Sequence, residues 1–452
     1  MSNLLIRTWI FVGAVAGAGA GVAVVAGPAS AQTPVRLSIG EAVRRASVET
    51  APVALAGLEA DQAEANFDDS RSALLPSIEA TGSMLNRTLN VDAFGISIPR
   101  EPGTTHNPLA GPFANFDARL HLSQTLFDAA ALLQTRAARE VVTGREAGIR
   151  AAVEAASHRA TLAYLDGSHA EAKLAARMAD AELAAELLAL AEEQLAAGVS
   201  AGIDVTRARA QKVAADGQVL VAQNAVQQAA IHLARAIGME PGTRFELTDD
   251  LGSVFSTADL PLDADAAVTA AVSRRPELQQ AEASHRTADA AKRAIRAERL
   301  PRVDLVADYG ANGLHPSDAI ATRQVGIQVS IPLFDGLGRA ARLAEQSAVV
   351  RASEIQATEL RQQISAEVRG ALLDRSNGGE REQVALEQLS LAEEELSQAR
   401  ERFANGVVGN VELIDAQASL LRARDALIDA QFATSVASAT LARAIGMASE
   451  LR

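Results

Sequence analysis

The chain has 452 residues, a formal net charge of −14 and no cysteine; 48% of its residues are hydrophobic but only 3% are aromatic. The lack of cysteine excludes disulfide scaffolds, thiolate metal sites, cysteine nucleophiles and lipidated cysteine anchors. The acidic balance argues against a nucleic-acid partner, which would need a concentrated positive surface. Because the apolar share is mostly Ala, Leu and Val, the composition favours long, closely packed helices over an aromatic globular core.

Residues 1–31 have the pattern of a secretory signal peptide. Arg7 supplies the positive start, an apolar stretch runs from Trp9 to Val25, and Ala29-Ser30-Ala31 has the small-x-small form of a cleavage site. A transmembrane anchor is the alternative interpretation of this stretch. No later stretch reaches the ~18 uninterrupted apolar residues that a spanning helix needs. The sequence therefore predicts an exported protein whose membrane contact does not use a helix.

The remaining sequence is duplicated. The heptapeptide Leu-Ala-Arg-Ala-Ile-Gly-Met occurs at 233–239 and again at 441–447, an offset of 208 (441 − 233 = 208). Two shorter matches occur in the same order: Leu126-Phe127-Asp128 with Leu333-Phe334-Asp335, and Leu75-Pro76 with Leu300-Pro301. The sequence thus predicts two copies of one unit, a first repeat over 32–240 and a second over 241–452.

Each repeat has the same predicted order of elements. A helix ends at Leu-Pro, because proline blocks its continuation. Two strands with alternating apolar and polar residues follow, then a very long helix, a glycine-marked turn and a shorter helix. Near the turns the apolar positions of the long helices step by three and four, as in coiled coils. The predicted ranges are helices at about 38–75 and 263–299, strands within about 76–126 and 301–334, long helices at about 129–197 and 336–405, and shorter helices at about 204–237 and 411–446.

The helix lengths predict a rod. Each long helix would span roughly 105 Å, and the two shorter helices of a repeat, stacked end to end, would run alongside it. The strands would lie at one end of the rod and the glycine turns at the other. Asn377-Gly378-Gly379 lies inside the second long helix. Two glycines cost about 2 kcal/mol relative to alanine, so we expect a kink or a frayed turn there.

Four alternating strands in an exported chain suggest an outer-membrane barrel. In hydrocarbon a sheet must close, because every backbone group needs a partner. Known barrels need about eight strands or more, so several chains must contribute, and three chains would give twelve strands. The alternative is a soluble β-hairpin cap on a secreted coiled coil.

Several short motifs in this doubled frame carry a family resemblance. They are Leu37 to Val43 with Pro52, Arg275-Pro276-Glu277-Leu278, Leu74-Leu75-Pro76-Ser77, Pro332 to Gly336, and the turns at Gly198-Val199 and Gly406-Val407. The chain resembles the TolC family of trimeric outer-membrane efflux proteins over essentially all of the mature sequence. The resemblance implies a mainly α fold with a β-barrel part, in which a homotrimer forms a twelve-stranded barrel in outer-membrane lipid. That barrel would continue into a long α-helical periplasmic tunnel, which docks on periplasmic adaptor proteins fed by inner-membrane transporters.

No catalytic grouping is evident in the sequence. The seven histidines are dispersed, without a metal-ligand spacing such as His-Glu-x-x-His. His158 and His169 could share one face of a helix, which we interpret as solvated. The sequence predicts no catalytic residues, cofactor or metal, and a protein that is not an enzyme.

The two turns are the first candidate site. Gly198-Val199-Ser200-Ala201-Gly202 and Gly406-Val407-Val408-Gly409-Asn410 lack side chains that would fill a protruding tip. A tight helical hairpin accounts for one glycine, but repeated small apolar residues also suit contact with the tip of another hairpin. By resemblance, the adaptor-docking positions are Gly198, Val199, Ser200, Gly406, Val407 and Val408.

The second candidate site is a set of carboxylates just beyond the turns. By resemblance, Glu412 and Asp415 match acidic rings that line a periplasmic constriction, and Asp204 matches an acidic position in its bond network. Capping of a helix N-terminus, worth about 0.3–1 kcal/mol, is the alternative role for such residues. Val408 and Phe403 stand where the well-studied duct has a basic residue and a tyrosine, so the same polar bonds cannot hold this constriction closed.

These observations predict a passive outer-membrane exit duct of a tripartite efflux pump or type I secretion system. Two alternatives from other classes are a periplasmic coiled-coil adaptor and a secreted structural coiled-coil protein. An adaptor would show a single hairpin, and a structural coiled coil would lack strands with a lipid-facing apolar side.

Overall fold

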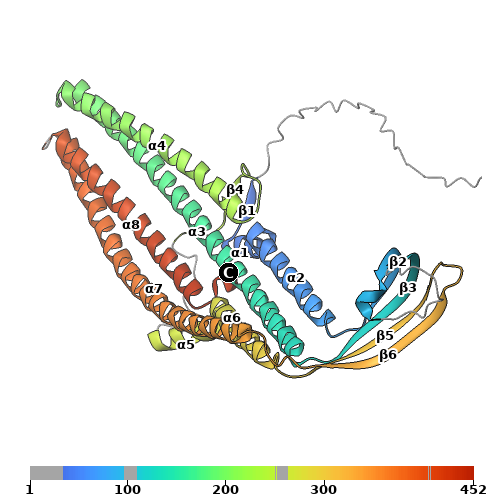
Figure 1. Cartoon of the computed structure of the whole chain (residues 1–452). Coiled ribbons are helices and arrows are strands. Elements are labelled where there is room, and N and C mark those ends of the chain that lie inside the picture. The colour runs from blue at the N-terminus through green and yellow to red at the C-terminus, as the bar shows by residue number, and fades with distance from the viewer. Residues whose placement is uncertain are drawn as a thin grey trace, which may run out of the picture.

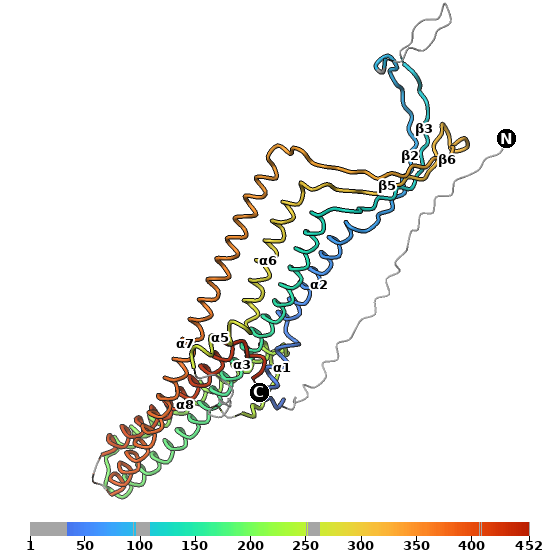
Figure 2. The backbone as a smooth tube through the Cα atoms, turned by 90° about the horizontal axis from the view of Figure 1, so that it is seen from below, coloured from blue at the N-terminus to red at the C-terminus, as the bar shows by residue number. Residues whose placement is uncertain are grey.

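The computed structural model describes residues 34–95, 109–249, 251, 263–405, 407 and 409–451. The molecule is elongated, with strands at one end and the turns of two helical hairpins at the other (Figures 1 and 2). The predicted signal peptide, residues 1–31, lies outside the described residues. Within the described part, no helix combines the length and the hydrophobicity that crossing a bilayer requires.

The elements follow the duplicated order. The first repeat contains β1 (Val35–Leu37), α1 (Ile39–Glu49), α2 (Ala51–Ser72), β2 (Ser77–Asn90), the 3-10 helix η1 (Val91–Phe94), β3 (Leu109–Phe127), α3 (Ala129–Ala196) and α4 (Gly202–Ala236). The second contains β4 (Phe245–Leu247), α5 (Ala264–Arg274), α6 (Pro276–Ala297), β5 (Arg302–Gly313), β6 (Ile320–Ser330), α7 (Gly338–Ala404), α8 (Asn410–Ala444) and the 3-10 helix η3 (Ala448–Glu450).

The long helices have shorter helices stacked along them, as their lengths predicted. α3 has 68 residues and packs against α4 in the half that carries the turns and against α1 and α2 in the other half. α7 has 67 residues and packs in the same way against α8 and against α5 and α6. The Leu-Phe-Asp motif explains where α3 begins, because Asp128 Oδ1 accepts the backbone N–H groups of Ala130 (2.9 Å) and Ala131 (3.0 Å).

The first predicted helix of each repeat is in fact two helices. In the first repeat the break falls at Thr50, whose backbone is extended (φ −89°, ψ 141°), and Pro52 lies in the first turn of α2. In the second repeat it falls at Arg275 (φ −59°, ψ 115°), directly before Pro276. Pro276 disfavours helical backbone at Arg275, the residue before it. Pro52 has no N–H group to donate to a preceding turn, so it is tolerated in the first turn of α2 but not inside one continuous helix. The short parallel pair of β1 and β4 was also not predicted from sequence.

The frayed turn expected as one outcome at Asn377-Gly378-Gly379 is wrong, because α7 is helical throughout its length. Small residues recur every seven positions along the buried side of α7 and of α8, which brings the two helices close together. They are Ala371, Gly378, Ala385, Ala392 and Ala399 in α7, and Ala416, Ala423, Ala430 and Ala437 in α8. At Gly378 a Cβ atom would lie only 2.9 Å from Thr434 Oγ1 and 3.2 Å from Thr434 Cα. Gly378 therefore permits close packing of α7 on α8.

This packing gives a prediction with an adjacent control. We expect Gly378→Ala to lower the free energy of unfolding by about 1–3 kcal/mol, since the added methyl group must push Thr434 away. Gly379→Ala should raise it by up to about 1 kcal/mol, because nothing lies within 4 Å of that position and alanine is the better helix former. Thermal unfolding of both purified variants measures the difference. Equal effects of the two substitutions would contradict the close-packing role of Gly378.

The four longer strands form one antiparallel sheet in the order β2-β3-β5-β6. Its register separates two faces. One row across all four strands is apolar, with Ile78 opposite Leu122, Leu122 opposite Ala307, and Ala307 opposite Val325. The adjacent row is polar, and consists of Glu79, His121, Asp308 and Gln324. Within the described part of the chain, the outer strands β2 and β6 each pair on one side only.

The helices form a wall in the same order as the strands they join. α2 packs on α3, α3 on α6, and α6 on α7 in the half next to the sheet; in the other half the order is α4, α3, α8 and α7. The β2, α2 and α4 elements thus lie along one edge of the wall, and β6 and α7 along the other. The chain is an open, curved strip, which places both free edges of the sheet in line with free helix faces (Figure 2).

The repeated heptapeptide lies in the middle of the strip. Leu233 and Ile237 are fully buried in one apolar cluster, and Leu441 and Ile445 are fully buried in a second. Gly238 (φ +76°) and Gly446 (φ +77°) end α4 and α8 in left-handed backbone, which favours glycine. The repeat is therefore explained by two equivalent core positions where a short helix ends.

Candidate functional site

The first tip is a compact turn between α3 and α4. Gly198 has φ +74°, and the backbone N–H groups of Gly198 and Val199 donate to the carbonyls of Leu195 and Gln194, both at 3.0 Å. This satisfies the last carbonyls of α3 and reverses the chain. The Val199 side chain is 61% exposed at the end of the hairpin. Ser200 is half-buried, and its hydroxyl has no hydrogen-bond partner within the described residues.

The second tip lies between α7 and α8. The Val407 N–H donates to the carbonyl of Arg402 at 2.9 Å, and the Val407 side chain is 67% exposed. Gly406 and Val408, the other two predicted docking residues of this tip, lie outside the described residues. Each tip thus presents one exposed valine at the same end of the molecule (Figure 1).

Two side-chain bonds connect the tips. Asn410, only 3% exposed, donates through Nδ2 to the carbonyl of Asp204 at 2.9 Å. Gln194 donates through Nε2 to the carbonyl of Ala404 at 3.1 Å. These bonds hold the first turn of α8 beside the first turn of α4. The two tips therefore lie at the same position along the long axis of the molecule.

The three predicted constriction carboxylates have three different environments. Asp204 caps α4, since its Oδ2 accepts the N–H of Ala201 at 3.2 Å. Glu412 forms an ion pair with Arg402 of α7, Oε1 to Nη1 at 2.5 Å. Asp415 is exposed and forms no hydrogen bond or ion pair with the described residues.

Phe403, one of the two departures noted in the sequence, is 3% exposed and packs in an apolar cluster with Leu187 and Leu413. This phenylalanine therefore stabilises the tip region by burial, where a tyrosine hydroxyl at the same position would need a polar partner.

A polar network that the sequence did not reveal joins α3 to α8 below the tips. His169 Nε2 and Lys173 Nζ lie 2.8 and 2.9 Å from Asp429 Oδ1. Lys173 also pairs with Asp425 at 3.0 Å, as does Arg177 at 2.5 Å. The charged residues of α3 are spaced by four, which places them on one face, and this spacing is the signal that could have predicted the network.

Asp180 completes this network at its upper end. Its carboxylate lies 3.1 Å from Arg177 Nη1 and 2.9 Å from Arg424 Nη1, and its side chain is 10% exposed. Burial raises the pKa of Asp180 in spite of both arginines. The carboxylate is therefore held in place by hydrogen bonds that fix the two hairpins relative to each other.

The interpretation of His158 and His169 as a solvated pair is wrong. His169 stacks on Phe432, with ring centroids 4.5 Å apart, in addition to its bond with Asp429. His158 is partly buried, and burial together with the Arg443 charge lowers its pKa to about 4. Both rings therefore belong to the packing between α3 and α8.

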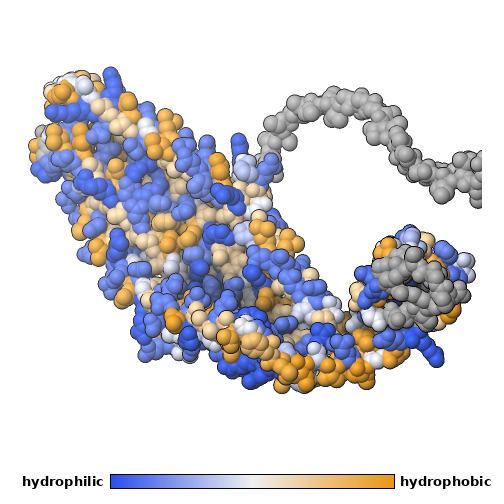
Figure 3. Space-filling view, in the orientation of Figure 1, coloured by the Kyte–Doolittle hydropathy of each residue, from blue (hydrophilic) through white to orange (hydrophobic). Residues whose placement is uncertain are grey.

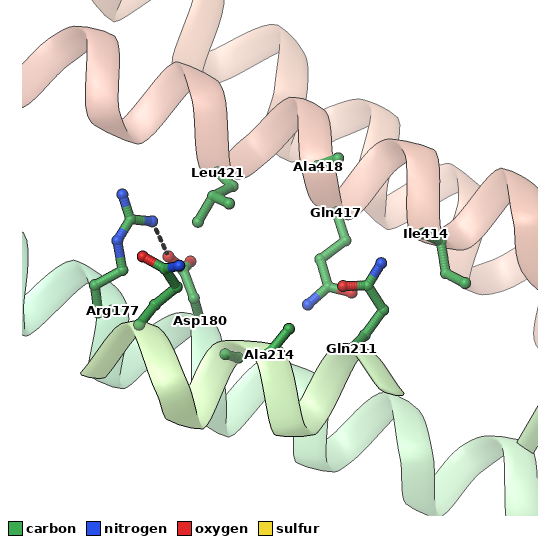
Figure 4. A pocket seen from close by; sticks show the side chains of 10 residues that line it. Arg177, Asp180, Gln211, Ala214, Ile414, Gln417, Ala418 and Leu421 are labelled. Atoms are coloured by element: carbon green, nitrogen blue, oxygen red, sulfur yellow. Dashed lines mark hydrogen bonds and ion pairs between the residues drawn. The ribbon is translucent and has the colours of Figure 1, made fainter. Parts of the chain in front are cut away.

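A cavity of about 130 Å³ lies between the hairpins next to this network (Figure 4). Gln211 of α4 and Gln417 of α8 point toward one another across it, and Asp180 and Arg177 close one end. The lining has no nucleophile paired with a base. Among the described residues no group of three or more His, Asp or Glu could hold a metal ion.

Long helical hairpins that continue from a four-stranded antiparallel sheet with one apolar face define the class of fold. The family model described as "Outer membrane efflux protein" matches residues 43–239 and 267–447. The chain therefore belongs to the outer membrane efflux protein family, whose members are channels and not enzymes.

Individual proteins show the same similarity. Protein CyaE of Bordetella pertussis (strain Tohama I) is 27% identical over 266 residues, which cover 58% of this chain and 56% of that protein. The match thus spans about half the length of this relative. Two solved structures share the fold: the outer-membrane channel OprN (TM-score 0.78, 21% identity, 90% of this chain and 89% of that chain) and CusC (TM-score 0.79, 20% identity, 90% and 91%).

Proposed function

We propose that three copies of this chain form a passive exit duct through the outer membrane, as part of a tripartite efflux pump or type I secretion system. The observation that carries the proposal is the sheet with one apolar face and two unpaired edges. A sheet in hydrocarbon must close on itself, and four strands are too few to do so. Three copies would give twelve strands, with β6 of each copy pairing with β2 of the next.

The helices support the same assembly. Because α7 continues from β6 and α2 precedes β2, closing the sheet would also bring the α7 edge of one copy against the α2 and α4 edge of the next. Such a head-to-tail contact generates a ring when its rotation closes. The helical part would then be a thin-walled, water-filled periplasmic tunnel. Such a wall has no thick apolar core to fill, which agrees with the scarcity of aromatic side chains.

The tips are the proposed contact with a periplasmic adaptor, which would connect the duct to an inner-membrane transporter. The level arrangement of the two tips and the exposure of Val199 and Val407 support this role. In a trimer six tips would form one ring. The docking residues that we propose are Gly198, Val199, Ser200, Gly406, Val407 and Val408.

We also propose that Asp415 supplies the main charge of the constriction near the tips. Glu412 would contribute less, because Arg402 neutralises it, and Asp204 would act mainly as the cap of α4. Asp415→Asn should therefore lower the preference of the pore for cations over anions more than Glu412→Gln does. The ratio of cation to anion permeability in planar bilayers measures this, and an equal loss in both variants would contradict the assignment.

The absence of cysteine makes the docking proposal directly testable. A single Val199→Cys or Val407→Cys variant, labelled with a photoreactive crosslinker in cells, should capture a periplasmic adaptor. The matched control is Val213→Cys, which is equally exposed (63%) but lies in the middle of α4. Capture at Val213 and not at the tips would contradict docking through the turns. A monomer in the soluble fraction would instead favour a secreted coiled-coil protein.

A further inference from the structure

The apolar face of the sheet carries one charge near its far end. On β6 the residues of this face are Val325 (73% exposed), Ile327 and Val329, and the next position away from the helices is Arg323. Its cross-strand neighbour on the same face is Tyr309, which is 64% exposed. Apolar side chains gather over the strand end of the molecule in Figure 3.

Arg323 differs from the other arginines of the sheet. Arg119 forms an ion pair with Asp117, and Arg302 with Asp304 at 2.9 Å, all on the polar face. Among the paired residues of the four strands, Arg323 is the one charged residue on the apolar face. It forms no hydrogen bond or ion pair with the described residues, so its guanidinium is available to an external partner.

The position of Arg323 along the strand is that of a membrane boundary. From Arg323 to Ile331 the chain has nine residues (331 − 323 + 1 = 9), and a tilted transmembrane strand needs about 9–11. An arginine on the lipid-facing side is strongly unfavourable at the bilayer midplane and nearly neutral at the interface. Tyrosine is likewise enriched at the interface. The strand β6 returns toward α7, so Arg323 lies at the end of the band away from the helices.

Large apolar side chains continue further from the helices on β2 and β3 than on β6. Met84 of β2 pairs with Phe116 of β3, and Phe116 pairs with Gly313, four residues beyond Tyr309 along β5. On β6 the charge of Arg323 interrupts the apolar face at the level of Tyr309. Strands that are tilted across a bilayer have their apolar segments displaced along the register in this way.

We infer that Arg323, with Tyr309 beside it, binds the phosphate of a lipid headgroup at the outer edge of the membrane-embedded sheet. The inference rests on the proposed function, since it requires the sheet to span the outer membrane. A guanidinium group has N–H donors in a fork that matches two phosphate oxygens. A tyrosine ring beside it can pack against the first part of an acyl chain of the same lipid, because tyrosine prefers the membrane interface. Two sources share this chemistry: a phosphorylated glycolipid and an anionic phospholipid.

The experiment compares lipid retention by the full-length assembly. Wild type, Arg323→Gln and Arg323→Lys are reconstituted in phosphatidylcholine nanodiscs that contain either phosphorylated lipid A or phosphatidylglycerol, then released and weighed by native mass spectrometry. We expect wild type to retain the anionic lipid in at least one of the two kinds of nanodisc. In that lipid, Arg323→Gln should retain about fivefold fewer lipid molecules per assembly than wild type, and Arg323→Lys should retain most of them. The arm that shows the loss identifies the source.

Arg302→Gln, which removes an arginine from the polar face of the same sheet, is the matched control and should retain lipid like wild type. Equal retention by wild type and Arg323→Gln in both arms, with all proteins inserted as trimers, would overturn the lipid site and leave the duct intact. Failure of wild type to insert or to form trimers would instead remove the proposed function, and the lipid site with it.

Discussion

Arg275→Ala is expected to lower the free energy of unfolding by about 3–5 kcal/mol, one of the two largest effects that we predict. Arg275 is 5% exposed at the junction of α5 and α6. Its guanidinium lies 2.7 Å from Glu367 of α7 and 3.1 Å from Glu277, and donates to the carbonyl of Ala444 at 3.4 Å. One side chain thus joins α6, α7 and α8, and its loss leaves Glu367 without its ion-pair partner in a partly buried position.

The contribution of this ion pair depends on pH with a defined sign. Burial opposes ionisation of Glu367, but hydrogen bonds from Arg275 and Gln363 hold its pKa below the usual value of 4.5. A carboxyl group whose pKa is depressed by folding contributes stability above about pH 4.5 and loses it as the pH falls through the folded-state pKa. The difference in stability between wild type and Arg275→Ala should therefore shrink below pH 4.5.

Chemical denaturation of the purified assembly at pH 7 and at pH 3.5 to 4 measures both effects. The adjacent Arg274→Ala is the control, because Arg274 is about half exposed and its ion pair with Glu450 is loose (3.7 Å). It should change stability by at most about 1 kcal/mol. A cost as small for Arg275 as for Arg274 would contradict the buried bridge between the three helices.

Tyr164→Ala, the second substitution with a large expected effect, should lower the free energy of unfolding by about 3–5 kcal/mol. Tyr164 is fully buried in the cluster that joins β1, α1 and α3. Its hydroxyl accepts the N–H groups of Thr248 (3.2 Å) and Asp249 (3.1 Å) and lies 3.2 Å from the carbonyl of Leu37. The aromatic ring fills the core, while the hydroxyl attaches the segment between the repeats to α3.

Tyr164→Phe separates these two roles. It keeps the ring but removes the acceptor of the Asp249 N–H, whereas the Thr248 N–H still donates to the carbonyl of Leu37 at 3.1 Å, so we expect the free energy of unfolding to fall by about 1–3 kcal/mol. Burial raises the pKa of Tyr164 to about 12 from its ordinary 10. A tyrosine with a raised pKa contributes stability that is complete below pH 10 and is lost as the pH rises toward 12. The phenylalanine variant should lack this alkaline loss.

Unfolding midpoints at pH 8 and pH 11 test this expectation. Tyr309→Phe is the control, because the other tyrosine of the chain is 64% exposed and its replacement should change stability by less than about 0.5 kcal/mol. If Tyr164→Phe were as neutral as Tyr309→Phe, the hydroxyl would not attach the inter-repeat segment to α3.

Only part of the candidate site could be predicted from the sequence. Gly198 and the valines at the turns could be found because a helical hairpin must reverse its chain, and the residues that do so are small. The environments of Asp204, Glu412 and Asp415 could not be found, since they depend on which helix lies beside each carboxylate. The network around Asp429 joins residues as far apart as His169, 260 positions away in the chain. Helical spacing predicts one face of each helix, and does not predict which faces meet.

The sequence by itself determined the properties that repeat along the chain: long helices from Ala-rich heptads, strands from period-two alternation, their order in two copies, and the turns. These are local, because the i to i+4 bond and the pleat set the period. Tertiary structure alone decided the pairing of β1 with β4, the continuity of α7 at Gly378, and the pairing of Arg323 with Tyr309 across two strands. Each of these depends on a neighbour that only packing supplies, and for Gly378 the approach of Thr434 turns a helix-breaking residue into a requirement for close contact.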